Sequence, residues 1–282
     1  MSGATSAQRH LALAEGVVEV VETGSGADAV VLVHGAASSP QAMGRLATRL
    51  ATPGWRVVAP ALDGYGGTVM QGGGDTLTRN ARMLAGLCAT LAARRVLLVG
   101  HSMGGLVALT ALRHGLAVDA AVLCEPVAFG ALDAQDPEQR AARDWDRAMA
   151  AGMAEHMAHG HVEDAVAGFI GAWSGQVWAD MPAAVRAGLV AMGRRLAMDV
   201  GTVSLDMTPA DAYAGITAPV LLLCGDASPP AARLICARLA GALPRARVAA
   251  VAAAGHMAPV AQPGLIAPLI QAFRDAMLPD GA

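Results

Sequence analysis

The sequence predicts an α/β fold in which helices cover both faces of a mostly parallel sheet. Short, continuous apolar runs recur along the 282 residues, and helix-like segments separate them. Such runs are typical of strands that are buried on both faces, and strands that alternate with helices form parallel sheets. Hydrophobic residues make up 54% of the chain and charged residues only 15%, so a large core can form.

The first part of the chain is expected to supply four strands of this sheet. We expect residues 1–10 to be a loose tail, because they are mostly small and polar. Apolar patterns predict strands at residues 17–22, 29–33, 55–61 and 96–99, with the first at a sheet edge. The apolar spacing of a helix occurs at residues 43–50, 76–92 and 106–114.

A long helical insert is expected in the second half. A strand at residues 120–124 precedes it, and no strand pattern is evident between about residues 130 and 215. Within the insert, helices are predicted at residues 133–158, 162–173, 183–198 and 209–213. The chain then ends with predicted strands at residues 219–224 and 247–251 and helices at residues 231–243 and 265–277.

Composition and charge disfavour several classes of protein. The net charge of −3 argues against nucleic acid as a partner. No apolar run reaches the length of a membrane span, and the N-terminus lacks the plan of a signal peptide. We therefore expect a cytoplasmic protein, either a monomer or a homodimer. Its four widely spaced cysteines are expected to be reduced core residues: Cys88, Cys124, Cys224 and Cys236.

A G-x-S-x-G pentapeptide with Ser102 at its centre lies between a predicted strand and a predicted helix. The pattern alone is weak evidence, but in this context it is specific for a nucleophile elbow, a sharp turn that exposes the serine hydroxyl. Glycines flank the serine because strand and helix pass too close for a Cβ atom. The preceding His101 is expected to pack beside the site rather than to act as a base. Ser102 is the predicted nucleophile.

A serine hydroxyl needs a base that takes its proton. His256 follows the last predicted strand and precedes the last helix, which places it at the carboxyl edge of the sheet, where ligands of open α/β sheets bind. A third group must orient the imidazole. Glu125 and Asp226, at the ends of two predicted strands, both fit the order serine, acid, histidine.

Two backbone N–H groups are needed to stabilise the oxyanion that forms when a serine attacks a carbonyl. The N–H of Met103, directly after the nucleophile, is one candidate. The second is the N–H of Ala36, in the loop after the strand at residues 29–33, where small residues allow close approach. Asp63 is expected to fix the glycine-rich turn that follows it.

A cluster of histidines and carboxylates occurs near the end of the first insert helix. Its spacing fits no established metal motif, so a solvated helix end is the favoured interpretation. The residues of this cluster are Glu155, His156, His159, His161, Glu163 and Asp164. We expect no metal site and no cofactor.

Several short motifs resemble those of the α/β-hydrolase superfamily, in the same order and across nearly the whole chain: residues 34–35, 63–66, 100–105, 225–226 and 255–257. The resemblance implies an eight-stranded, mostly parallel sheet. It also implies a core formed by residues 1–129 and 216–282, with residues 130–215 as a helical cap.

The sequence departs from the family pattern at the position of the acid. Members often carry the acid three residues after the glycine that ends strand seven, and here that position is Ser228. Some members, among them several haloalkane dehalogenases, place the acid at the end of strand six instead. Glu125 occupies the matching place, so the resemblance favours Glu125 over Asp226.

These features predict a serine hydrolase that cleaves a small to medium carboxylic ester, lactone or thioester through an acyl-enzyme on Ser102. The expected partner is an apolar small molecule, which flexible methionines of the insert would suit. Three alternatives remain open: a C–C bond hydrolase, a cofactor-free lyase or cyclase on the same scaffold, and a ligand-binding module with little turnover.

Overall fold

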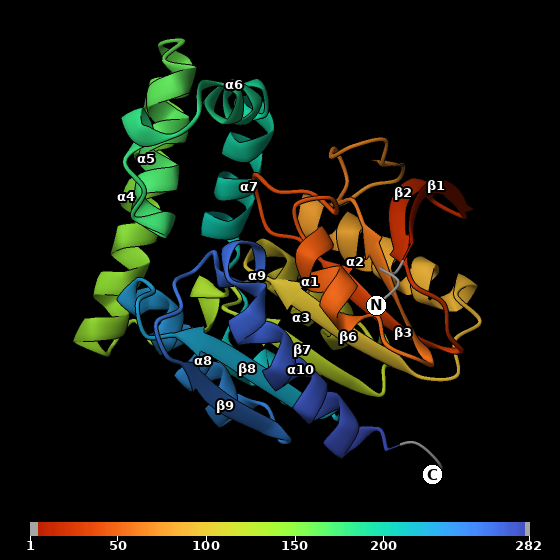
Figure 1. The fold of residues 1–282 in the computed structure, drawn as a ribbon. Helices are drawn as coiled ribbons and strands as arrows, with labels where there is room; N and C mark the ends of the chain where they lie inside the picture. The colour runs from red at the N-terminus through yellow and green to blue at the C-terminus, as the bar shows by residue number, and fades with distance from the viewer. Residues whose placement is uncertain (1–4, 280–282) are drawn as a thin grey trace.

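The computed structural model describes residues 5–279, which form one nine-stranded sheet with helices on both faces (Figure 1). The strands of these residues are β1 (Ser6–Leu13), β2 (Gly16–Thr23), β3 (Asp28–Val33), β4 (Trp55–Pro60), β5 (Val69–Met70), β6 (Val96–His101), β7 (Ala120–Cys124), β8 (Val220–Gly225) and β9 (Ala246–Val251). The strand order is β1-β2-β4-β3-β6-β7-β8-β9, and β5 pairs only with β2. The strands from β4 to β9 along this order are parallel, which confirms the predicted α/β class.

The helices cover both faces of the sheet and also form a separate group between β7 and β8. They are α1 (Gly44–Leu50), α2 (Thr76–Thr90), α3 (Met103–Arg113), α4 (Pro137–Ala158), α5 (Val162–Ser174), α6 (Ala183–Ala191), α7 (Gly193–Leu205), α8 (Pro230–Ala242), α9 (Ala258–Ala261) and α10 (Pro263–Met277). Helices α1 and α10 pack on one face, where Leu46 and Ile270 share an apolar core with Val99 of β6. Helices α2, α3 and α8 pack on the other, where Leu84 and Leu239 are buried. Because both faces are covered, the central strands β3 and β7 are buried along their whole length and are almost entirely apolar.

The expected loose tail at residues 1–10 was wrong for the part that the structure describes. Residues 6–13 form β1, which pairs antiparallel with β2 from Ser6 opposite Thr23 to Leu13 opposite Gly16. The strand is mostly exposed, so its sequence lacks the apolar alternation that identifies a half-buried strand. Its backbone pairing with β2 holds it in place instead. Residues 1–4 of the expected tail lie outside the described residues.

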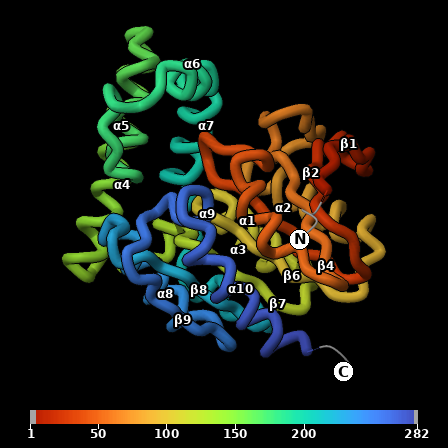
Figure 2. The backbone as a smooth tube through the Cα atoms, in the orientation of Figure 1, coloured from red at the N-terminus to blue at the C-terminus, as the bar shows by residue number. Residues whose placement is uncertain are grey.

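The stretch between β7 and β8 contains helices, as the sequence predicts; α4 to α7 together form the helical segment. The tube in Figure 2 leaves the sheet after β7, runs through the segment and returns at β8. The single helix expected at residues 183–198 is instead two, α6 and α7, and buried Gly193 at their junction lies against Val162 of α5. The stretch expected as a helix at residues 209–213 is a short 3₁₀ turn, Ala210–Tyr213.

The interior of the helical segment is a small apolar cluster of its own. Met153 of α4, Val166 of α5 and Leu196 of α7 meet there, and all three are buried. In the part of the chain that the structure describes, no helix has both the length and the mean hydropathy that crossing a membrane requires.

Candidate active site

Ser102 lies at the sharp turn between β6 and α3, as the pentapeptide predicts. Its backbone has φ of 55°, in the region that non-glycine residues rarely occupy, so the turn is strained. A Cβ atom on Gly104 would lie 2.4 Å from the carbonyl oxygen of His34, because α3 begins directly over the end of β3. The glycine is therefore required by close packing of the turn.

A continuous chain of hydrogen bonds runs from Ser102 through His256 to Glu125. Ser102 Oγ lies 3.0 Å from His256 Nε2, and His256 Nδ1 lies 2.7 Å from Glu125 Oε2. All three side chains are buried. They come from three separate loops that meet at the carboxyl edge of the parallel strands.

Glu125 is held by donors on both carboxylate oxygens. Its Oε1 accepts from the backbone N–H of Gly225 at 2.7 Å and from the hydroxyl of Ser228 at 2.6 Å. Burial acts to raise the pKa of Glu125, but the hydrogen bond and charge of His256, with the donors Ser228 and Gly225, hold this pKa below its ordinary value. The carboxylate is thus charged at neutral pH.

Asp226, the other candidate acid, lies elsewhere. Its side chain is exposed, and its backbone N–H donates to the carbonyl of Val251 at the end of β9. Ser228, which stands where many superfamily members carry their acid, instead donates to Glu125. The structure therefore brings Glu125, and not Asp226, to His256.

Two aromatic rings fix the position of His256. Trp173 of α5 lies against the imidazole with ring centroids 4.3 Å apart. His101 Nε2 donates to the backbone carbonyl of His256 at 2.8 Å. Burial, with the charge of His256, lowers the pKa of His101 to about 3, so His101 is neutral and acts as a donor here.

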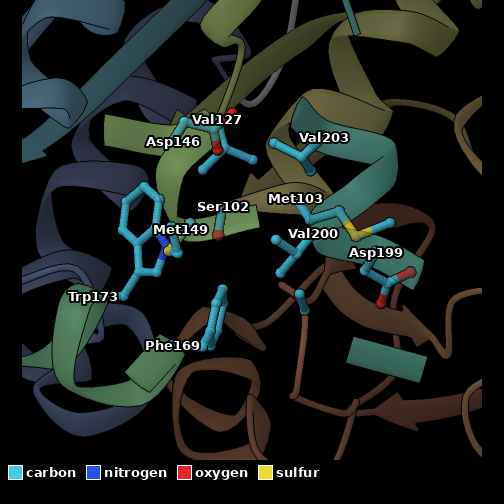
Figure 3. A pocket seen from close by; sticks show the side chains of 11 residues that line it. Ser102, Met103, Val127, Asp146, Met149, Phe169, Trp173, Asp199, Val200 and Val203 are labelled. Atoms are coloured by element: carbon cyan, nitrogen blue, oxygen red, sulfur yellow. The ribbon is translucent and has the colours of Figure 1, made fainter. Parts of the chain in front are cut away.

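A cavity with about 300 Å³ of empty space lies over Ser102. Ala36 and Met103, the predicted oxyanion residues, both line it. Figure 3 shows Ser102 surrounded by apolar side chains from the helical segment, among them Met149, Phe169 and Trp173. The three tryptophans of the insert have different places. Trp173 lines this cavity, and Trp145 packs against Trp173 with ring centroids 5.2 Å apart. Trp178 does not line the cavity and donates a hydrogen bond to Glu163.

Two carboxylic side chains that the sequence did not predict as site residues also line the cavity. Asp146 of α4 is 2% exposed and Asp199 of α7 is fully buried. Burial raises the pKa of Asp146 to about 6 and also raises the pKa of Asp199, which Arg195 partly offsets. The available signal was an acidic residue at the helical spacing of an apolar face, since Asp146 stands three residues before Met149 and seven before Met153.

The predicted histidine cluster is only partly assembled. The ligand atoms of His156, His161 and Asp164 lie within 4.8 Å of one another, and all three residues are exposed. The ring of His159 instead lies 2.9 Å from the backbone carbonyl of Glu155 through its Nδ1. The four cysteines are free thiols.

Comparison with known proteins agrees with this architecture. An alpha/beta hydrolase from Sphaerobacter thermophilus is 25% identical, with a TM-score of 0.70 over 94% of this chain and 100% of that one. Carboxylesterase CesB from Bacillus subtilis shares the fold, at 18% identity and a TM-score of 0.71 over 95% of this chain and 91% of that one.

A curated relative matches over a shorter stretch. A 2-hydroxy-6-oxononadienedioate/2-hydroxy-6-oxononatrienedioate hydrolase from Burkholderia vietnamiensis is 41% identical over 92 residues. The match spans 30% of this chain and only 31% of that protein's length. Over most of the chain, the sequence profile of the alpha/beta hydrolase family matches, at residues 30–269. Together with the fold, this match shows that the chain belongs to the alpha/beta hydrolase family.

Proposed function

We propose that this hydrolase cleaves a small to medium carboxylic ester, lactone or thioester through an acyl-enzyme on Ser102. The observation that carries the proposal is the hydrogen-bond chain from Ser102 through His256 to Glu125, with Ser102 in the lining of an apolar cavity. Such an arrangement of nucleophile, base and orienting acid is recognised by its geometry rather than by its place in the sequence.

In the first half of the reaction, His256 Nε2 takes the proton of Ser102 Oγ while the oxygen attacks the substrate carbonyl carbon. The backbone N–H groups of Met103 and Ala36 stabilise the resulting oxyanion. His256 then passes the proton to the leaving alcohol or thiol as its bond to the acyl carbon breaks. Glu125 keeps Nδ1 protonated and stabilises the imidazolium.

In the second half, water attacks the acyl-enzyme. His256 takes one proton of the water, the hydroxide oxygen adds to the acyl carbon, and the same proton returns to Ser102 Oγ as the ester bond breaks. The products are a carboxylic acid and the free enzyme. No step requires a cofactor.

The cavity supports a small, uncharged acyl group as the substrate. Most of the side chains around Ser102 are apolar, among them Val127, Met149 and Phe169. The cavity walls are apolar apart from Ser102, Asp146 and Asp199; because Arg195 pairs with Asp199, the charge of Asp146 is the one that disfavours an anionic group. In this proposal residues 130–215 act as a cap over a core of residues 1–129 and 216–282.

A C–C bond hydrolase is the second candidate, because of the likeness to the Burkholderia dienedioate hydrolase. The same serine and histidine could serve such a reaction. The substrate named for that relative carries two carboxylates, however, and two buried acids face the cavity here. The ester reaction therefore has the stronger support.

A fluorophosphonate probe tests the proposal directly. It should add one phosphonyl group to the wild-type protein and none to Ser102→Ala, as read from intact protein mass. Hydrolysis of p-nitrophenyl butyrate should be lost in the same variant. A wild-type protein that gives no adduct would contradict the acyl-enzyme mechanism.

A further inference from the structure

The loop after β3 holds one of the two proposed oxyanion donors, Ala36, and its conformation needs support. The next residue, Ala37, has φ of 51°, which is strained for a residue with a Cβ atom. Both alanines pack against the apolar cluster of the helical segment as well as following a core strand. A strained loop keeps one geometry only where the surrounding contacts determine it.

A relay of hydrogen bonds connects this loop to α7. The backbone N–H of Ala37 donates to the hydroxyl of Tyr65 at 2.9 Å, and that hydroxyl donates to Asp199 Oδ2 at 2.5 Å. Arg195, one turn earlier on α7, binds the other oxygen of Asp199. Burial, followed by the charge of Asp199, raises the pKa of Tyr65, so the phenol stays protonated and can donate.

The turn that carries Tyr65 is shaped to receive Arg195. Its guanidinium lies 5.4 Å from the centre of the Tyr65 ring. A Cβ atom on Gly64, which has φ of 81°, would lie 2.6 Å from Arg195 Nη1. On its other side the Tyr65 ring meets His34, with centroids 5.0 Å apart. The phenol is thus fixed between the oxyanion loop and the helical segment.

We propose that Tyr65 is a positioning residue for the oxyanion loop, and that α7 sets its place through Asp199 and Arg195. The inference rests on the proposed function for the role of Ala36 as a donor, but not for the contacts themselves. It makes the oxyanion loop dependent on the seating of the helical segment, because a displaced α7 would remove the acceptor of the Tyr65 hydroxyl.

Tyr65→Phe tests this proposal, and Tyr213→Phe is a matched control. Tyr213 is the second tyrosine of the chain, is equally buried, and is not among the residues that line the cavity of Ser102. Amide hydrogen exchange should be at least about tenfold faster at Ala37 in Tyr65→Phe, because its hydrogen-bond acceptor is lost. Tyr213→Phe should leave exchange at Ala37 unchanged.

Kinetics provides the second measurement. In Tyr65→Phe, kcat for p-nitrophenyl butyrate should fall by about 10- to 100-fold while KM stays within about twofold. The inhibition constant of phenylboronic acid should rise in parallel, because its tetrahedral adduct places an oxygen where the oxyanion forms. The double variant with Asp199→Asn should be little worse than Tyr65→Phe alone, since both changes break one relay.

The outcomes separate this proposal from the proposed function. Unchanged exchange at Ala37 in Tyr65→Phe, or equal losses of kcat in both tyrosine variants, would overturn the positioning role. Lack of phosphonate labelling in the wild-type protein would instead overturn the hydrolase mechanism. Exchange at Ala37 would then still decide whether Tyr65 holds the loop.

Discussion

Glu125 shows how the surroundings of one side chain fix its charge and direction. One oxygen of its carboxylate accepts a hydrogen bond from His256, and the other accepts from Ser228 and from the backbone N–H of Gly225. Rotation of the carboxylate would break both sets of bonds at once. Its position one strand earlier than usual is therefore stabilised by the serine that stands at the usual place.

Glu125→Gln should slow hydrolysis of p-nitrophenyl butyrate by roughly 10⁴-fold, the scale at which a neutral orienting group acts in such sites. The amide cannot stabilise the imidazolium. Asp226→Asn is the matched control, because it makes the same chemical change on an exposed side chain. A large loss in Asp226→Asn with normal activity in Glu125→Gln would reverse the assignment.

Asp146 makes stability depend on pH in a defined direction. Because burial raises its pKa to about 6, ionisation costs the folded state more than the unfolded chain. This cost is small below the ordinary pKa of about 4, grows as pH rises from there to about 6, and is constant above that. The free energy of unfolding of Asp146→Asn minus that of wild type should therefore be roughly 2 kcal/mol larger at pH 8 than at pH 4. Urea denaturation at both values measures it, and a constant difference would contradict the burial argument.

Among the secondary-structure elements, the junction of β6 and α3 is the least tolerant of added atoms. The helix begins over the end of β3, with Gly104 against the carbonyl of His34. Helix α4, by contrast, contains Gly152 with open space around its Cβ position. Replacement of glycine by alanine should therefore lower the stability of the protein at position 104 in α3 and raise it at position 152 in α4.

Gly104→Ala should lower the free energy of unfolding by at least about 2 kcal/mol. It should also abolish activity, because the added methyl group displaces the turn that carries Ser102. Gly152→Ala should stabilise it by about 1 kcal/mol, because alanine loses less entropy in a helix interior and nothing obstructs its methyl group. Chemical denaturation of both variants measures the contrast. Similar destabilisation in both would show that helix packing, not the tight turn, sets the tolerance.

At the scale of the whole molecule, the cavity combines an apolar wall with buried acids, and in the proposed function this combination favours uncharged substrates. Above pH 6, Asp146 is expected to carry a negative charge beside Ser102. We expect p-nitrophenyl butyrate to be hydrolysed at least on the order of a hundredfold faster than mono-p-nitrophenyl succinate at pH 7.5. The ratio of kcat/KM values measures this preference, and Asp146→Asn should reduce it. Equal rates for the two esters would mean that the acids do not face the acyl group.

The sequence predicted the core of the fold well, because apolar runs and the pentapeptide around Ser102 are local signals. It missed β1, whose stability comes from pairing with β2 rather than from buried side chains. It also missed Asp199, whose hydrogen-bond partner Tyr65 lies 134 residues away. Glu125 was a candidate acid from its place at the end of a predicted strand, and Ser228 at the usual position of the acid favoured it over Asp226. Long-range polar contacts leave no periodic pattern to detect.

The helical segment enters the chain as one contiguous insertion between β7 and β8. Replacement of this segment by another would therefore leave Ser102, Glu125 and His256 on the loops that follow the sheet strands. The relay to Tyr65 limits such replacement, since the new segment needs a carboxylate and an arginine where Asp199 and Arg195 now lie. Chimaeras that lack Asp199 and Arg195 would keep Ser102 but remove the hydrogen-bond support of the loop at Ala37.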